Sequence, residues 1–271
     1  MDYKERQTCI YEDGMMFNRL PLVTTDPTKL EEQARQYMTS RSFDFVSSGA
    51  AFRQWKIIPR MLCQTTHRDL SVKLFGLLYK SPVIMAPIGV QAIYHDDKEL
   101  GSAEVAASLG IPYIHSTAAT SSIEEVAYAN GSGHCWFQLY WPKDNELTKS
   151  LLSRAKQSGY EVLVVTLDTW TLAWRPGYRV GDGLVVLFDS GIRIGSDIVK
   201  ALCLGAKAVL VGRPWVYGLG IGGKKGAQDV LLDLLADLDL TLGLARLQGV
   251  QDCKRTILRK VACEGDIGST Y

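Results

Sequence analysis

Residues 184–218 read LVVLFDSGIRIGSDIVKALCLGAKAVLVGRPWVYG, and this stretch decides the fold. An apolar run at 184–188 is followed by a turn that contains Gly191, then by a helical pattern and a second apolar run at 208–212. Two apolar strands joined by a helix are the unit of a parallel sheet, because a parallel pair needs a long crossover. The stretch therefore predicts a parallel sheet covered by helices.

The same alternation extends back to residue 82. Near-continuous apolar character predicts six parallel strands, at Pro82–Ala86, Ile111–His115, Cys135–Tyr140, Val162–Asp168, Leu184–Phe188 and Ala208–Gly212. Apolar stripes predict helices at Pro27–Met38, Lys98–Leu109, Ser121–Ala129, Ser196–Leu204 and Ala227–Leu247, and a further helix that starts after Asp144. Asp26 is the expected N-cap of the first of these helices, and Ser121 and Glu124 are expected to form a capping box. We expect an α/β fold of the TIM (β/α)8 type with about six βα units and an N-terminal helical segment.

The barrel is expected to be incomplete. The interval 169–183, TWTLAWRPGYRVGDG, contains a proline, three glycines and no helical period, so it predicts no crossover helix. Residues 82–247 number 166, against about 250 for a complete eightfold barrel. We predict a single domain over residues 1–271, with an N-terminal segment (1–81), barrel units (82–247) with a deletion near 178–184, and a tail (248–271).

Composition excludes several classes of protein. Thirty Lys and Arg residues balance 29 Asp and Glu residues, so charge suggests neither a nucleic-acid partner nor an anionic membrane. The six cysteines are far apart and form no C-x-x-C motif, which favours a reduced, cytoplasmic protein. No apolar run approaches the roughly 18 residues of a membrane span, and no cluster of side chains has metal-ligand spacing.

The loops after the last two predicted strands indicate a phosphate site. Gly191 and Gly212 allow close approach of the backbone, while Arg193 and Arg213 supply positive charge. In eight-stranded barrels this position often binds phosphate through backbone N–H groups and a helix N-terminus. The alternative is that these glycines only form tight turns, and the phosphate interpretation is favoured.

These motifs resemble one family. Together with PVIMAPIGVQ (82–91), IHSTAATSSIEEVA (114–127), WFQLYWPKDNELTKSLLSRAKQSGY (136–160) and VLVVTLDTWTLAWRPGY (162–178), they resemble the FMN-dependent α-hydroxy acid dehydrogenase/oxidase family, closest to its lactate-monooxygenase-like members. The resemblance runs from about Pro27 to about Leu247. It implies FMN as cofactor, held by Pro87, Ile88, Gly89, Ser116, Gln138, Tyr140, Thr166, Asp189, Ser190, Gly191, Ile192, Arg193, Gly212 and Arg213.

The resemblance also implies substrate contacts. Tyr140 resembles a tyrosine near the reacting hydroxyl group, and Arg175 resembles an arginine that binds the substrate carboxylate; a solvated loop arginine is the alternative for Arg175. Asp168 resembles the carboxylate that orients a catalytic histidine. Phe45 stands where the family usually has a tyrosine, and it lacks the hydroxyl group.

The segment that carries the family's histidine base, its neighbouring arginine and its flavin-directed lysine is missing between Tyr178 and Val185, so no catalytic residue is assigned. We interpret His67, His95, His115 and His134 as structural or surface residues. The first hypothesis is FMN-dependent oxidation of a small 2-hydroxy acid to the 2-oxo acid. The alternative is a catalytically inactive pseudoenzyme or truncated gene product that binds FMN or partner subunits, and assembly into a homo-oligomer is left open. A phosphosugar-handling barrel is a third hypothesis, but it does not account for Gln138, Tyr140 and Thr166.

Overall fold

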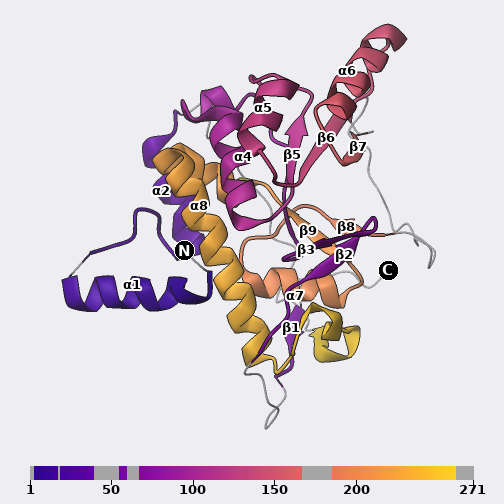
Figure 1. Ribbon diagram of the computed structural model, residues 1–271. Helices are drawn as coiled ribbons and strands as arrows, with labels where there is room; N and C mark the ends of the chain where they lie inside the picture. The colour runs from indigo at the N-terminus through magenta and orange to yellow at the C-terminus, as the bar shows by residue number, and fades with distance from the viewer. Residues whose placement is uncertain (1–2, 18, 40–54, 60–66, 167–184, 261–271) are drawn as a thin grey trace, which may run out of the picture.

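A computed structural model describes residues 3–17, 19–39, 55–59, 67–166 and 185–260 (Figure 1). Its centre is a curled sheet of six parallel strands. These strands are β4 (Val83–Met85), β5 (Tyr113–Ser116), β6 (Cys135–Tyr140), β7 (Val162–Thr166), β8 (Leu187–Phe188) and β9 (Ala208–Val211). Each lies within or overlaps one of the six predicted strands, and β6 has the predicted bounds.

The strand order is β7-β6-β5-β4-β9-β8. Pairing of β4 with β9, in the register Val83 to Val209, joins the first strand of the series to the last, as in a closed ring. Among the described residues, β7 and β8 each have only one neighbouring strand, so the ring is open between them. The predicted fold, an incomplete TIM-type barrel, is confirmed.

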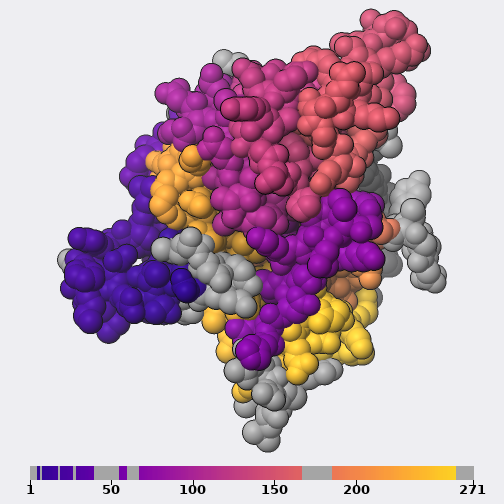
Figure 2. All heavy atoms as spheres, viewed as in Figure 1, coloured from indigo at the N-terminus to yellow at the C-terminus, as the bar shows by residue number. Residues whose placement is uncertain are grey.

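Helices cover the outer face of this sheet. They are α2 (Pro27–Tyr37), α4 (Lys98–Leu109), α5 (Ile123–Asn130), α6 (Asn145–Gln157), α7 (Gly195–Cys203) and α8 (Arg213–Leu244). An additional helix, α1 (Tyr3–Phe17), has no strong apolar stripe in the sequence, and in Figure 2 its residues form a lobe at the edge of the molecule beside α8.

Two helix predictions need correction. The capping box joins Ser122 to Glu125, one residue later than predicted, because the hydroxyl of Ser121 donates to Glu99 instead. The last helix extends further towards the N-terminus than predicted: α8 begins at Arg213 and is broken at Gly222 and Gly223, where the backbone is not helical, and its second half contains most of the predicted Ala227–Leu247. Sequence analysis did not predict the first half of α8, because several glycines in residues 218–226 are typical of a loop.

Apolar side chains form one cluster inside the curled sheet and a large one outside it, and a smaller outer cluster contains Phe137 and Leu139 of β6. The inner cluster contains Ile84, Ile114, Trp136 and Ala208, one from each of four strands. Leu74 and Tyr79 join it from the antiparallel hairpin β2 (Val72–Leu74) and β3 (Leu77–Tyr79). The hairpin therefore plugs the inside of the sheet beneath the carboxyl ends of the strands.

The outer cluster packs the strands against the helices. Val83 and Met85 of β4 lie in it beside Trp215, Leu231 and Leu238 of α8. A short antiparallel pair joins β1 (Trp55–Ile57), which precedes the barrel strands, to β10 (Leu258–Lys260) at the C-terminal end of the described residues. Sequence reasoning missed these short strands because three residues carry no measurable alternation.

Candidate flavin site

Three polar side chains form a continuous row across the carboxyl ends of β5, β6 and β7. The hydroxyl of Ser116 donates to Oε1 of Gln138 over 3.1 Å, and Nε2 of Gln138 donates to Oγ1 of Thr166 over 2.7 Å. Ser116 and Gln138 are 2% and 1% exposed. Alternation along each strand places all three on the inner face, two residues beyond Ile114, Trp136 and Val164 of the inner cluster. The structure thus brings together three residues that the sequence assigned to the flavin.

The row has spare donors. Oε1 of Gln138 already accepts from Ser116 and from the backbone N–H of Thr117, while its amide nitrogen uses one of two N–H groups. The hydroxyl oxygen of Thr166 accepts from Gln138, and the described residues offer no acceptor for its proton. An amide N–H and a hydroxyl group are therefore available to carbonyl or ring-nitrogen acceptors, which a flavin ring presents.

A buried carboxylate fixes the loops that border this row. Glu99 of α4 is fully buried, and it accepts from the backbone N–H of Gln91 (3.1 Å), from the N–H and hydroxyl of Thr120 (2.8 and 2.6 Å) and from the hydroxyl of Ser121 (2.9 Å). Burial alone would raise the pKa of Glu99, but the hydrogen bonds from Thr120 and Gln91 outweigh it and hold the pKa below its usual value. Glu99 thereby ties the loop after β4 to the loop after β5.

The loop after β4 holds Pro87, Ile88 and Gly89, which the resemblance placed along the flavin. A Cβ atom on Gly89 would lie 3.0 Å from both the Cβ and the carbonyl oxygen of Ala118, in the loop that Glu99 holds. Glycine is therefore needed for this close approach of the two loops. Glu99 itself was missed: it stands in the first turn of α4, where an acidic residue is ordinarily read as solvated.

The loop after β8 has the backbone of an anion site. Ser190 and Gly191 both have positive φ angles, 81° and 79°, and the Asp189 carboxylate accepts from the N–H of Ser190 over 2.7 Å. Among the described residues, the N–H groups of Gly191 and Ile192 have no acceptor. Successive N–H groups in such a turn form a nest that binds anions. This geometry favours the phosphate interpretation over a simple tight turn.

The next loop adds a helix N-terminus. Gly212 follows β9, and α8 begins at Arg213 with Pro214 in its first turn. The first N–H groups of a helix have no partner within it and attract anions. Because β8 pairs with β9 in parallel, the loops that carry Arg193 and Arg213 follow neighbouring strands. The guanidinium of Arg193 lies 4.0 Å from Glu31 of α2, which directs that side chain towards the N-terminal helices.

The predicted substrate residues are only partly described. Tyr140 ends β6 opposite Thr166, and its side chain is 37% exposed, so it stands at the open edge of the row. Asp168, Arg175 and Phe45 lie outside the described residues, and their assignments stay predictions.

None of the four histidines joins the row. His115 points to the outer face, where it stacks on Phe137, and burial lowers its pKa to about 4. His134 pairs with Glu161 at the amino end of β6 (3.0 Å), His95 lies beside Asp97, and His67 is exposed before the barrel. No group of three or more potential metal ligands occurs in the described part of the chain. No described helix is long and apolar enough to cross a membrane.

Parallel strands with polar side chains and anion-binding loops at their carboxyl ends define a βα-barrel protein with a ligand site at that edge. A family model described as FMN-dependent dehydrogenase matches residues 28–179 and 177–260. The chain belongs to this family, whose members use FMN and oxidise α-hydroxy acids.

Comparisons with individual proteins support the same family assignment. The chain is 38% identical over 395 residues to the FMN-dependent alpha-hydroxy acid dehydrogenase qulF of Penicillium citrinum, covering 98% of each chain. It is 32% identical over 387 residues to an FMN-dependent alpha-hydroxy acid dehydrogenase of Schizosaccharomyces pombe, covering 93% of this chain and 95% of the relative. The structure of an (S)-mandelate dehydrogenase has a TM-score of 0.79 at 23% identity, covering 88% of this chain and 99% of that one, which supports the fold.

Proposed function

We propose that this chain binds FMN at the carboxyl edge of its open barrel and does not turn over 2-hydroxy acids. The observation that carries the first part is the row of Ser116, Gln138 and Thr166, which shares the carboxyl edge of the sheet with the nest at Ser190 and Gly191. The row would hydrogen-bond the polar edge of the flavin ring. The nest and the N-terminus of α8 would hold its phosphate, with Asp189 and Ile192 along the ribityl chain.

The second part rests on the length of the chain between β7 and β8, which is too short for two further βα units. Twenty residues separate Thr166, the end of β7, from Leu187, the start of β8. A single βαβ unit takes roughly 30 residues or more, so this interval is too short for two further units. The aligned length with the Penicillium citrinum relative, 395 residues, exceeds the 271 residues of this chain by 124. We infer an internal deletion near 178–184 and a smaller one near 47–55.

The inferred deletion removes the proton-transfer chemistry. When bound, FMN accepts the hydride equivalent from an α-hydroxy acid, but the proton of the hydroxyl group needs a base within hydrogen-bond reach. By resemblance, that histidine, the carboxylate-binding arginine and the flavin-directed lysine belong to the deleted segment. Tyr140 remains at the edge of the site and can orient a hydroxyl group. A phenol is a poor base at neutral pH because its ordinary pKa is about 10.

Comparing FMN with riboflavin tests the cofactor part directly. Riboflavin lacks the phosphate, so a chain that uses the nest and the α8 N-terminus should bind FMN at least tenfold more tightly, measured by quenching of flavin fluorescence. Added inorganic phosphate should weaken FMN binding and leave riboflavin binding unchanged. Equal affinity for the two flavins, or no binding of either, would overturn the cofactor part.

The open edges of the sheet favour association between copies of the chain. On β7, Leu163 and Val165 are 46% and 36% exposed, although in a closed ring their outer face would be covered. Unpaired apolar edge strands promote pairing with another chain. We expect a dimer or larger homo-oligomer in analytical ultracentrifugation at micromolar concentration; a monomer at that concentration would contradict this expectation.

A further inference from the structure

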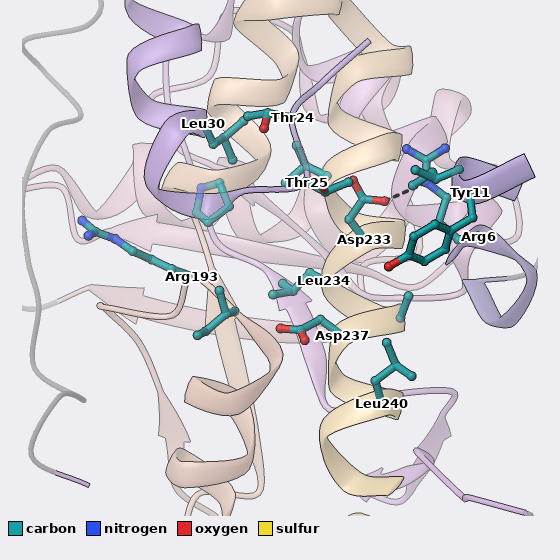
Figure 3. Close-up of a pocket in the computed structure, with 15 residues that line it drawn as sticks. Arg6, Tyr11, Thr24, Thr25, Leu30, Arg193, Asp233, Leu234, Asp237 and Leu240 are labelled. Atoms are coloured by element: carbon teal, nitrogen blue, oxygen red, sulfur yellow. Dashed lines mark hydrogen bonds and ion pairs between the residues drawn. The ribbon is translucent and has the colours of Figure 1, made fainter. Parts of the chain in front are cut away.

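A pocket of about 570 Å³ lies outside the sheet, between the N-terminal helices and α8 (Figure 3). Its apolar walls come from Ile10 and Tyr11 of α1, Leu30 of α2, and Val230, Leu234 and Leu240 of α8. Leu30, Val230 and Leu234 are at most 6% exposed and form the buried part, whereas Tyr11 and Leu240 are 60% and 39% exposed and stand at the mouth. The volume falls within the roughly 300–1,000 Å³ of small-molecule sites.

The pocket is separate from the flavin row. Ser116, Gln138 and Thr166 lie on the inner face of the sheet, whereas the pocket lies among the outer helices. Arg193 borders the pocket, but its guanidinium points away from it in Figure 3 and lies near Glu31. The positive charge of Arg193 is therefore not directed at the contents of the pocket.

Most of the charge along this face of α8 is balanced. Arg6 of α1 bonds Asp233 through Nε (2.7 Å) and Asp229 through Nη1 (3.2 Å), and Asp229 also pairs with Lys225. Two cations thus meet two carboxylates. Figure 3 shows the bond between Arg6 and Asp233 at the upper side of the pocket.

Asp237, one turn further along α8, is the exception. Its Oδ2 accepts from the backbone N–H of Gly195 over 2.6 Å, and no cation pairs with it among the residues that the structure describes. Burial raises the pKa of Asp237, and the Gly195 hydrogen bond only partly opposes this. A carboxylate in apolar surroundings is stabilised by a positive charge placed against it.

We propose that this pocket binds an organic cation, a primary amine that carries an apolar ring or chain. The ammonium group contacts the carboxylate of Asp237, and the apolar part packs against Leu30, Val230 and Leu234. The hydroxyl of Tyr11, turned towards the pocket in Figure 3, is a second polar contact. The same charge disfavours carboxylate ligands, so 2-hydroxy acids are excluded from this site.

Titration with 2-phenylethylamine at pH 7 tests the proposal on the purified full-length chain, by isothermal calorimetry. We expect saturable one-to-one binding, with no detectable binding of 3-phenylpropionate, which has the same ring and the opposite charge. Asp237→Asn should weaken amine binding at least tenfold, since an amide can still accept the N–H of Gly195 but carries no charge. Asp96→Asn, an exposed acidic residue outside the pocket, should leave binding unchanged.

A second variant tests the cavity rather than the charge. Ala236 lines the pocket, so Ala236→Trp should fill it and abolish amine binding while the circular dichroism spectrum stays that of the unmodified chain. The proposal is overturned if the amine does not bind the unmodified chain, if Asp237→Asn binds it equally well, or if a folded Ala236→Trp chain still binds it. None of these outcomes depends on FMN.

Discussion

The side-chain amide of Gln138 donates to the hydroxyl of Thr166 over 2.7 Å, across two neighbouring strands at the carboxyl edge of the sheet. Gln138 is almost fully buried and also accepts from Ser116. A buried amide of this kind fixes the direction of the donors that the row offers, because its oxygen and one of its two N–H groups have defined partners. The row is therefore preorganised for a ligand that presents acceptors.

Replacing Gln138 tests the row. Gln138→Met keeps the length of the side chain but removes its donor and acceptor, so FMN affinity should fall about tenfold, as expected for one or two hydrogen bonds of about 0.5–1.5 kcal/mol each. Flavin fluorescence titration measures this change. Gln228→Met, at a half-buried glutamine of α8 whose amide lies 3.4 Å from Ser108, is the matched control. Unchanged FMN affinity in Gln138→Met would show that the row of Ser116, Gln138 and Thr166 does not bind FMN.

Replacing Glu99 tests how the flavin loops are positioned. Glu99→Gln removes the charge and turns one acceptor oxygen into a donor that faces Thr120, Ser121 or Gln91. The free energy of unfolding in urea should fall by about 1–3 kcal/mol, and FMN affinity should fall with it.

Glu104→Gln, at an exposed residue of the same helix that pairs with Lys224, is the control for Glu99→Gln. It should cost less than about 1 kcal/mol, because exposed ion pairs contribute little. Equal losses in the two variants would show that Glu99 is not a positioning residue.

His115 makes stability depend on pH. Its pKa is about 4 in the folded chain, below its ordinary value of 6.5, so the unfolded chain binds the extra proton first. Stability should therefore decrease as pH falls from 6.5 towards 4. The loss between pH 7 and pH 5 is on the order of 2 kcal/mol.

His115→Phe should lack this part of the pH dependence, because phenylalanine keeps the stacking on Phe137 and does not titrate. Urea unfolding at pH 5 and pH 7 measures the difference between the two chains, and His95→Gln, at a half-exposed histidine, is the control. An identical pH dependence in His115→Phe and the unmodified chain would show that His115 is not protonated on unfolding in this range.

The sequence predicted the strands well because buried parallel strands are continuous apolar runs, as in Cys135–Tyr140. The family resemblance pointed to Ser116, Gln138 and Thr166, and the predicted strands agreed with it because each residue stands near the end of such a run. Glu99 could not be recognised, because its partners Gln91, Thr120 and Ser121 come together only in the folded chain. The first half of the helix that begins at Arg213 was missed for a different reason: its glycines are typical of a loop, whereas in the structure the two halves of α8 approach so closely at Gly218 and Gly226 that neither position has room for a Cβ atom.

The pocket beside α8 was equally inaccessible to sequence reasoning. The spacing of Asp229, Asp233 and Asp237 on one helix face is visible in the sequence, and such a series is ordinarily a solvated face. Only the structure shows that Arg6, more than 220 residues away in the chain, forms ion pairs with two of them, and that Lys225 also pairs with Asp229. It also shows that Asp237 is left without a cation among the described residues.

We propose that the chain binds FMN and does not turn over 2-hydroxy acids. Anaerobic addition of lactate, glycolate or mandelate to the FMN-loaded chain tests it, with the visible flavin absorbance as the readout and dithionite as the control for reducibility. We expect dithionite to bleach the bound flavin and none of the three acids to do so. Bleaching by any of these acids would show that the chain is a catalyst.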